Sequence, residues 1–208
     1  MNCTVLPICP FGNIKWWSLF LTSENVTLNG YENFQKQTWR NRYDIQGANG
    51  TQSLTIPIIR ESGVKTKTKD IQLFHETHWK KVHWRSIKSA YGSSPFWIYY
   101  SDAIEKMYTS QFTTLYEFSL KSIEVIAEEL ALDSELKTTL EKPNQEVDFS
   151  KEFKPSKCYF KNEPYLQVFS DRFEFQPNLS ILDLLFNLGP ETEHYLTQLT
   201  PPGIKMNY

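Results

Sequence analysis

The chain has 208 residues, of which 40% are apolar, 22% charged and 15% aromatic, and its net charge is −2. This composition excludes a disordered or collagen-like chain, and the near-neutral charge argues against a nucleic-acid-binding protein. A chain of this length can bury a sizeable core without a disulfide or a metal. We therefore expect a soluble globular protein.

The cysteines and the opening segment bear on the compartment. Three cysteines form no Cys-x-x-Cys pair, and an odd number cannot all pair within one chain (Cys3, Cys9 and Cys158). The start superficially resembles a signal peptide, but it lacks a basic region, and its apolar run Trp16–Leu21 is too short to span a bilayer. These features predict a cytoplasmic protein without a membrane span.

The first 60 residues favour strands. Side chains alternate between apolar and polar from Trp39 to Gln46, the run Gly47–Gly50 is typical of a turn, and Thr51–Ile59 provides a return strand. The sequence thus predicts an antiparallel hairpin over about residues 39–59. Further strand candidates are Asn25–Tyr31, Ile71–Phe74 and Tyr165–Phe175.

Helical patterns follow over about residues 77–132 and 180–199. Seven residues recur on one face of a predicted helix over 79–91, and we expect this face to be buried (Trp79, Val82, His83, Ser86, Ile87, Ala90 and Tyr91). Further helices are expected over about 96–108, over 113–132 with a capping box at Thr114 and Glu117, around 184–186, and over 191–199.

These elements together predict an α+β fold in which the strand-rich N-terminal part packs with the mainly helical part. The stretch 133–157 is charged and poor in apolar residues, which favours a loop-rich or flexible excursion. We expect one domain over residues 1–208.

Signatures of common NTPases, dinucleotide-binding enzymes, zinc proteases and α/β-hydrolases are missing from the sequence. His75, His78 and His83 lie close together, but the last two would point about 140° apart on a helix, so we predict no metal site and assign no cofactor. His83 lies on the apolar helix face. It is either a hydrogen-bonded core residue or a general base at the edge of a pocket.

Basic residues gather at the start of the predicted hairpin. Arg40 and Arg42 share the strand face opposite Trp39 and Asn41. They would either grip a phosphate or carboxylate or lie solvated beside an acidic partner. Asn41 alternates with apolar residues, and a buried amide needs partners, so it either pins a turn or contacts a ligand. Lys36 adds positive charge nearby.

Several segments together resemble the WbqC-like protein family. They are Leu6–Phe11 with Trp16 and Trp17, Lys36, Trp39–Arg42, the turn and apolar strand ending at Pro57, Trp79–His83, Ala90–Phe96 and Asn178–Leu185. The resemblance covers most of the chain apart from about 133–157. It implies a bacterial protein of O-antigen or other surface-polysaccharide biosynthesis, and it suggests a glycyl or aminoacyl transferase that acts on an amino sugar.

On this hypothesis the catalytic residues are His83, which deprotonates the attacking amine, and Asn41, which orients or polarises a carbonyl. The substrate-binding residues are Lys36, Trp39, Arg40, Arg42 and Tyr91. The partners are a small-molecule or nucleotide-sugar substrate and an aminoacyl donor or acyl carrier. The alternative is a non-catalytic binding module or scaffold for glycan-precursor assembly, and the sequence leaves both open.

Overall fold

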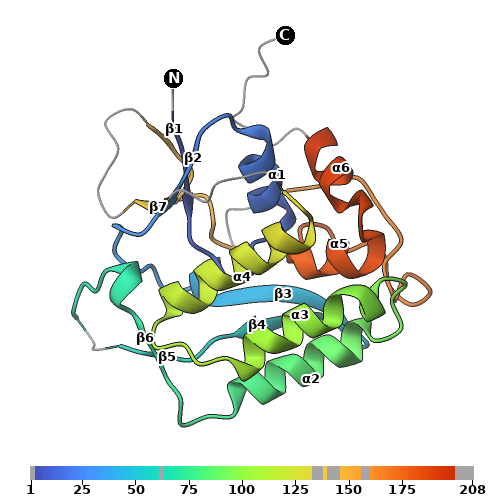
Figure 1. Ribbon diagram of the computed structural model, residues 1–208, viewed down its shortest axis with the longest axis horizontal. Helices are drawn as coiled ribbons and strands as arrows, with labels where there is room; N and C mark the ends of the chain where they lie inside the picture. Colours follow the sequence, from blue (N-terminus) through green and yellow to red (C-terminus); the bar gives the residue numbers. More distant parts are fainter. Residues whose placement is uncertain (1–2, 61–62, 133–137, 140–145, 156–159, 200–208) are drawn as a thin grey trace.

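The structure, a computed structural model, describes residues 3–60, 63–132, 138–139, 146–155 and 160–199. Within these residues six α-helices pack with small sheets, and the helices dominate the middle and the C-terminal part (Figure 1). The predicted α+β class is thus confirmed. None of the described helices is long and apolar enough to cross a membrane.

A parallel sheet at the N-terminus was not predicted. Strand β1 (Cys3–Pro7), helix α1 (Ile14–Thr22) and strand β2 (Val26–Asn29) form a βαβ unit in which β1 and β2 pair in parallel. The strands β7 (Thr138–Thr139) and β8 (Glu146–Asp148) complete the order β7-β2-β1-β8.

The two outer strands of this sheet come from the stretch 133–157, which was expected to be a loop-rich excursion. Both strands pair in parallel with β1 or β2. The segments 133–137, 140–145 and 156–157 of that stretch lie outside the described residues. The single domain over 1–208 stays a prediction.

The predicted hairpin is present but shorter. Strands β3 (Arg42–Gly47) and β4 (Gly50–Thr55) pair antiparallel, with Gly47 opposite Gly50. The segment Trp39–Asn41 is a 3-10 helix and not the start of the strand, because Thr38 accepts a hydrogen bond from the Arg40 backbone and caps the turn. Beyond β4 the chain leaves the hairpin, and β5 (Ile58–Ile59) pairs instead with β6 (Gln72–Leu73).

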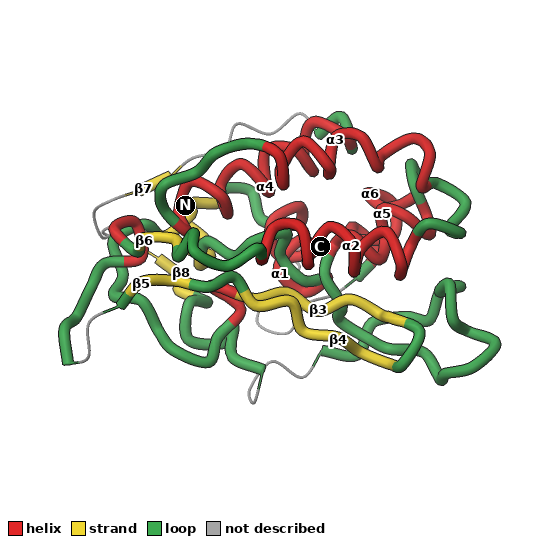
Figure 2. The backbone as a smooth tube through the Cα atoms, turned by 90° about the horizontal axis from the view of Figure 1, so that it is seen from below, coloured by secondary structure: helices red, strands yellow, loops and turns green. Residues whose placement is uncertain are grey.

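Helix α2 (Trp79–Tyr91) has the predicted limits and packs on the hairpin strand β3, while helix α3 (Trp97–Thr109) packs on α2 (Figures 1 and 2). The predicted buried face is wrong at Val82, which is 55% exposed. Because α3 lies along the other flank, Trp84 takes the inward position and stacks on Trp97 with ring centroids 5.5 Å apart.

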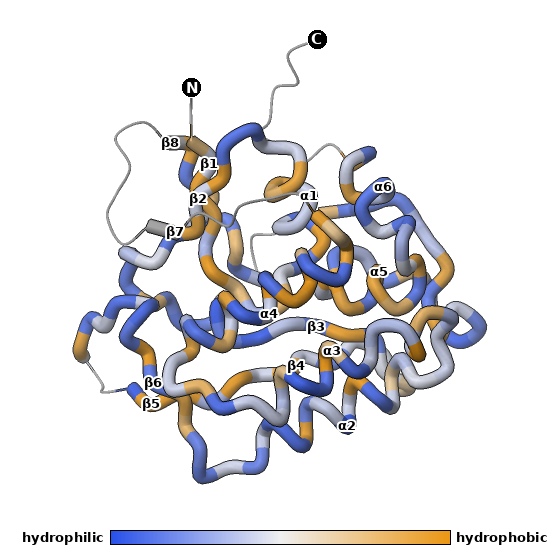
Figure 3. The backbone as a smooth tube through the Cα atoms, viewed as in Figure 1, coloured by the Kyte–Doolittle hydropathy of each residue, from blue (hydrophilic) through white to orange (hydrophobic). Residues whose placement is uncertain are grey.

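Helix α4 (Leu115–Glu129) begins with the predicted capping box, in which the Glu117 backbone N–H donates to the Thr114 hydroxyl at 3.1 Å. The C-terminal helices are α5 (Ile181–Leu188) and α6 (Glu191–Gln198). Helix α5 is hydrophobic along most of its length and lies in the core (Figure 3). The predicted strand over Tyr165–Phe175 is wrong, since this segment forms turns and irregular backbone.

Candidate functional site

A groove of about 280 Å³ brings together three residues predicted to bind or act on substrate: Lys36, Asn41 and Arg42. Phe34 and Gln37 contribute to it from the connection after β2, and Ile58 and Arg60 from the end of β5. This volume is just below ~300 Å³, the lower limit of the volumes typical of small-molecule sites. We refer to it as the basic groove.

The electrostatics of the basic groove favour an anion. Lys36, Arg42 and Arg60 carry positive charges, and none of the described residues that line it is acidic. Arg42 Nε and Arg60 Nε and Nη1 are buried and have no hydrogen-bond partner among the described residues. Buried N–H groups normally have partners, so these guanidinium groups are suited to a ligand that accepts hydrogen bonds.

Asn41 fixes the geometry at the entrance to the hairpin. The Ile56 backbone N–H donates to the Asn41 backbone carbonyl at 2.8 Å, and the Asn41 side-chain Nδ2 donates to the Ile56 backbone carbonyl at 3.1 Å. Asn41 is therefore tied to Ile56 through both its backbone and its side chain. Gln37, also in the groove wall, has a φ of +54°, a backbone region that non-glycine residues rarely adopt.

Arg40 does not lie in the basic groove. Its guanidinium is fully buried and binds Glu32 through two hydrogen bonds, at 2.6 and 2.7 Å, and donates to the Ser150 carbonyl at 2.9 Å. The expected strand face shared by Arg40 and Arg42 is therefore wrong, because the 3-10 turn separates them. Burial raises the pKa of Glu32, although Arg40 opposes this shift.

Trp39 and Tyr91 are buried away from the basic groove. The Trp39 indole N–H donates to the Asp44 carboxylate at 3.3 Å. The Tyr91 hydroxyl donates to Asp183 at 2.9 Å, and burial raises the pKa of Tyr91 well above its usual range. Their contribution to substrate binding stays a prediction, and neither is among the described residues that line the groove.

His83 lies in a chain of buried hydrogen bonds. Its Nε2 is 3.2 Å from the Thr55 carbonyl, and its Nδ1 is 2.9 Å from the Tyr43 hydroxyl, which in turn lies 2.6 Å from the Tyr108 hydroxyl. Because a carbonyl only accepts, the proton is on Nε2, Tyr43 donates to Nδ1, and Tyr108 donates to Tyr43.

Burial lowers the pKa of His83 to about 4, against the opposing effect of the Thr55 carbonyl, so the ring is neutral near pH 7. Both ring nitrogens are engaged inside the protein, and His83 is not among the described residues that line the basic groove. The general-base role stays a prediction. The geometry supports the alternative interpretation, a hydrogen-bonded core histidine.

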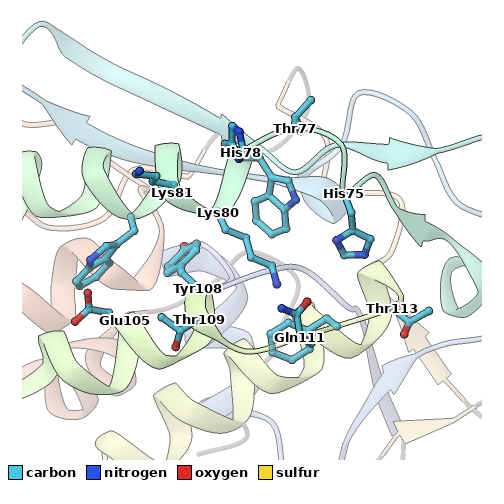
Figure 4. Close-up of a pocket in the computed structure, with 13 residues that line it drawn as sticks. His75, Thr77, His78, Lys80, Lys81, Glu105, Tyr108, Thr109, Gln111 and Thr113 are labelled. Carbon is cyan, nitrogen blue, oxygen red and sulfur yellow. The ribbon is translucent and has the colours of Figure 1, made fainter.

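A larger cavity of about 650 Å³ lies between the start of α2 and the connection from α3 to α4 (Figure 4). Lys80 extends into it, with its ammonium 5.5 Å from the centroid of the Phe112 ring, and burial lowers the pKa of Lys80. His75 and Glu105 also line it. Within the described parts of the chain, no three His, Cys, Asp or Glu residues are arranged to hold a metal ion.

The chain belongs to the WbqC-like protein family, whose family model matches residues 12–158. A relative is the uncharacterized protein Rv1507c of Mycobacterium tuberculosis, which is 25% identical over 193 residues, covering 78% of this chain and 83% of the relative. No solved structure matches the chain. The family match contains every residue of the basic groove and ends before the segment Asn178–Leu185.

Arg60 was not predicted as a residue of the site. A weak signal was available, since Arg60 directly follows Thr51–Ile59, the predicted return strand of the hairpin. Arg60 lies beside Arg42 because the chain leaves the hairpin after Thr55. The chain leaves there because β5 pairs with β6, and no local sequence pattern predicts this pairing.

Proposed function

We propose that the protein is a cytoplasmic transferase that binds a phosphorylated amino sugar in the basic groove and attaches an acyl or aminoacyl group to it during surface-polysaccharide biosynthesis. The observation that supports the binding step is the convergence of Lys36, Arg42 and Arg60 on one groove with buried guanidinium N–H groups free of protein partners among the described residues. The link to surface polysaccharides comes from the family resemblance.

Charge and size together support a sugar phosphate. An anion relieves the mutual repulsion of three cations, and phosphate oxygens match the donor geometry of arginine. A volume of about 280 Å³ suits a monosaccharide phosphate better than a complete nucleotide sugar. The net charge of the whole chain is −2, so the groove is a local positive feature and not part of a generally basic surface.

The competing function is a non-catalytic module that holds the same precursor for other enzymes. It is favoured by one observation: His83, the predicted general base, is neutral, buried and hydrogen-bonded at both ring nitrogens. Both functions need the basic groove, but only the transferase consumes an acyl donor. A turnover assay with an amino-sugar phosphate and an activated acyl or aminoacyl ester separates them.

Binding is tested by calorimetry with glucosamine 1-phosphate and with glucosamine, for the wild type and the variants Arg42→Ala, Arg60→Ala and Lys36→Ala. The matched controls are Arg172→Ala and Lys65→Ala, which remove exposed charges elsewhere. We expect each arginine variant of the groove to weaken phosphate binding about 10- to 100-fold, since a hydrogen bond to a charged group contributes about 1.5–3 kcal/mol.

Thermal melts of the same proteins show whether the fold survives. The groove arginines have no ion-pair partner among the described residues, so we expect melting temperatures close to those of the controls. If Arg42→Ala and Arg60→Ala bind the sugar phosphate as the controls do, the basic groove is not the anion site.

A further inference from the structure

We infer that a small cavity beside the basic groove binds the carbonyl oxygen of the acyl group, an inference that rests on the proposed transfer to a phosphorylated amino sugar. The cavity has a volume of about 10 Å³, at the lower limit for one water-sized group. Its walls come from three stretches far apart in the sequence, within residues 9–13, 39–44 and 178–180. Arg42 lines both the cavity and the basic groove.

Backbone hydrogen bonds hold these three stretches together. The Ser180 N–H donates to the Asp44 carbonyl at 2.9 Å, which joins the start of α5 to the hairpin. The Ile181 N–H donates to the Gly12 carbonyl at 2.9 Å, which joins α5 to the turn before α1. The cavity is therefore a fixed junction of three elements, and side chains that line it have defined positions.

Three side chains in the cavity wall have buried polar atoms without a hydrogen-bond partner among the described residues: Asn13 Nδ2, Ser180 Oγ and Arg42 Nε. Asn13 is only 6% exposed and Ser180 only 1%. A buried polar group without a partner destabilises the protein, and one such group comes from each of the three stretches. All three can donate, so an oxygen that accepts hydrogen bonds satisfies them together.

The cavity suits a carbonyl oxygen better than a phosphate or a carboxylate. Asp44 also lines it, but its carboxylate accepts from the Trp39 indole and the Ser53 hydroxyl, and the Arg42 guanidinium in the same wall carries the opposite charge. The small volume excludes a phosphate and a carboxylate, since each brings more than one oxygen. A carbonyl presents a single oxygen and fits this volume.

In the proposed reaction these donors act when charge develops on that oxygen. The sugar amine forms a C–N bond to the acyl carbon of an activated ester donor, and the carbonyl π electrons move onto the oxygen. As the carbonyl re-forms, the leaving alcohol departs with the bonding electrons and takes up the amine proton. Fixed donors around the oxygen stabilise this intermediate.

The backbone beside the cavity passes through the left-handed region. Phe11 and Asn178 have φ values of +57° and +56°, and Gly12 has +49°. A Cβ atom at Gly12 would lie 2.9 Å from Trp17 Nε1, so a side chain does not fit there. Of these residues only Phe11 has a bulky side chain that disfavours this region, so the surrounding structure must enforce its conformation.

Two variants remove donors and spare the fold. Ser180→Ala deletes a hydroxyl that makes no capping bond to α5. Asn13→Asp keeps the oxygen that accepts from the Trp16 N–H at the start of α1, but replaces the donor by a carboxylate. The matched control is Ser119→Ala, which removes an equally buried hydroxyl without a partner in the described structure, away from the cavity in helix α4.

The test compares calorimetric binding of N-acetylglucosamine 1-phosphate and glucose 1-phosphate, which share the phosphate and differ in the carbonyl. We expect the wild type and Ser119→Ala to bind the acetylated sugar phosphate about tenfold more tightly. Ser180→Ala should lose this preference while binding glucose 1-phosphate unchanged, and Asn13→Asp should also lose the preference. Equal binding of both sugars by the wild type, or a preference retained in Ser180→Ala, overturns the inference but leaves the proposed function standing.

If neither sugar phosphate binds, the proposed function fails, and acetamide alone decides about the cavity. Its carbonyl should shift the NMR signal of the Arg42 Nε–H in the wild type and in Ser119→Ala, but not in Ser180→Ala. An unshifted signal in the wild type overturns the inference.

Discussion

Replacing His83 by glutamine should make the free energy of unfolding decrease less as the pH falls below neutral. The neutral ring donates to the Thr55 carbonyl and accepts from Tyr43. A glutamine amide has two N–H donors and an oxygen acceptor, so it can serve the same two partners, but it does not titrate. The substitution therefore removes the proton-binding group while keeping the pattern of hydrogen bonds.

The sign follows from the lowered pKa of His83. Above pH 6.5 the ring is neutral in both the folded and the unfolded chain and causes no pH dependence. As the pH falls below 6.5 the unfolded chain takes up a proton, whereas the folded protein does so only near pH 4, so the free energy of unfolding decreases between these values. The difference of roughly 2.5 pH units, at about 1.36 kcal/mol per unit, corresponds to about 3 kcal/mol.

The assay is urea unfolding of the wild type and of His83→Gln at several pH values between 4 and 7.5. The difference between their free energies of unfolding should change with a slope of up to about 1.4 kcal/mol per pH unit, in the direction that favours the variant at low pH. Burial raises the pKa values of Glu32 and Asp183, which stabilises the folded state as the pH falls, but both proteins share these groups. Parallel curves for the two proteins would refute a buried neutral His83.

Three further changes probe the fold. Arg40→Ala should lower the free energy of unfolding by about 3–5 kcal/mol in urea, because Glu32 is left buried without its partner; replacing both residues by apolar ones should recover most of the loss. Thr114→Ala should cost about 1 kcal/mol in a thermal melt, and Thr114→Ser should restore it. Gly12→Ala should cost more than about 1 kcal/mol in urea and more than Gly50→Ala, since both glycines have positive φ but only the first is crowded. A Gly12→Ala protein as stable as Gly50→Ala would contradict the crowding argument.

Local signals in the sequence predicted the helices well. The limits of α2 follow from its apolar spacing and the glycine after it, and the start of α4 follows from the capping box at Thr114. Val82 was wrongly predicted to be buried because the apolar spacing gives the centre of the buried face of a helix but not how wide that face is. The position of α3 beside Trp84 decides which flank is covered, and no pattern within α2 encodes that position.

Non-local pairings account for the misses. Strands β7 and β8 have two and three residues, and they become strands only by pairing with β2 and β1 from the other end of the chain. The alternation of aromatic residues around Tyr165 suggested a strand. In the structure the Tyr165 hydroxyl donates to Asp183 at 2.5 Å, and the Gln167 side chain donates to the Gln176 backbone carbonyl. Side-chain contacts therefore order this segment without a strand partner.

Arg40 and Arg42 lie two positions apart but have different environments: Arg40 forms a buried ion pair, whereas Arg42 lines the basic groove. In an extended strand they would share a face, but a 3-10 helix turns by about 120° per residue, so the turn at Trp39–Asn41 sends Arg40 to Glu32. Its charge is thereby neutralised by a bidentate carboxylate. Arg42 begins the strand, has no ion-pair partner among the described residues, and keeps a buried Nε–H without an acceptor. The same turn therefore takes Arg40 away from the site and leaves Arg42 where it lines both the basic groove and the small cavity.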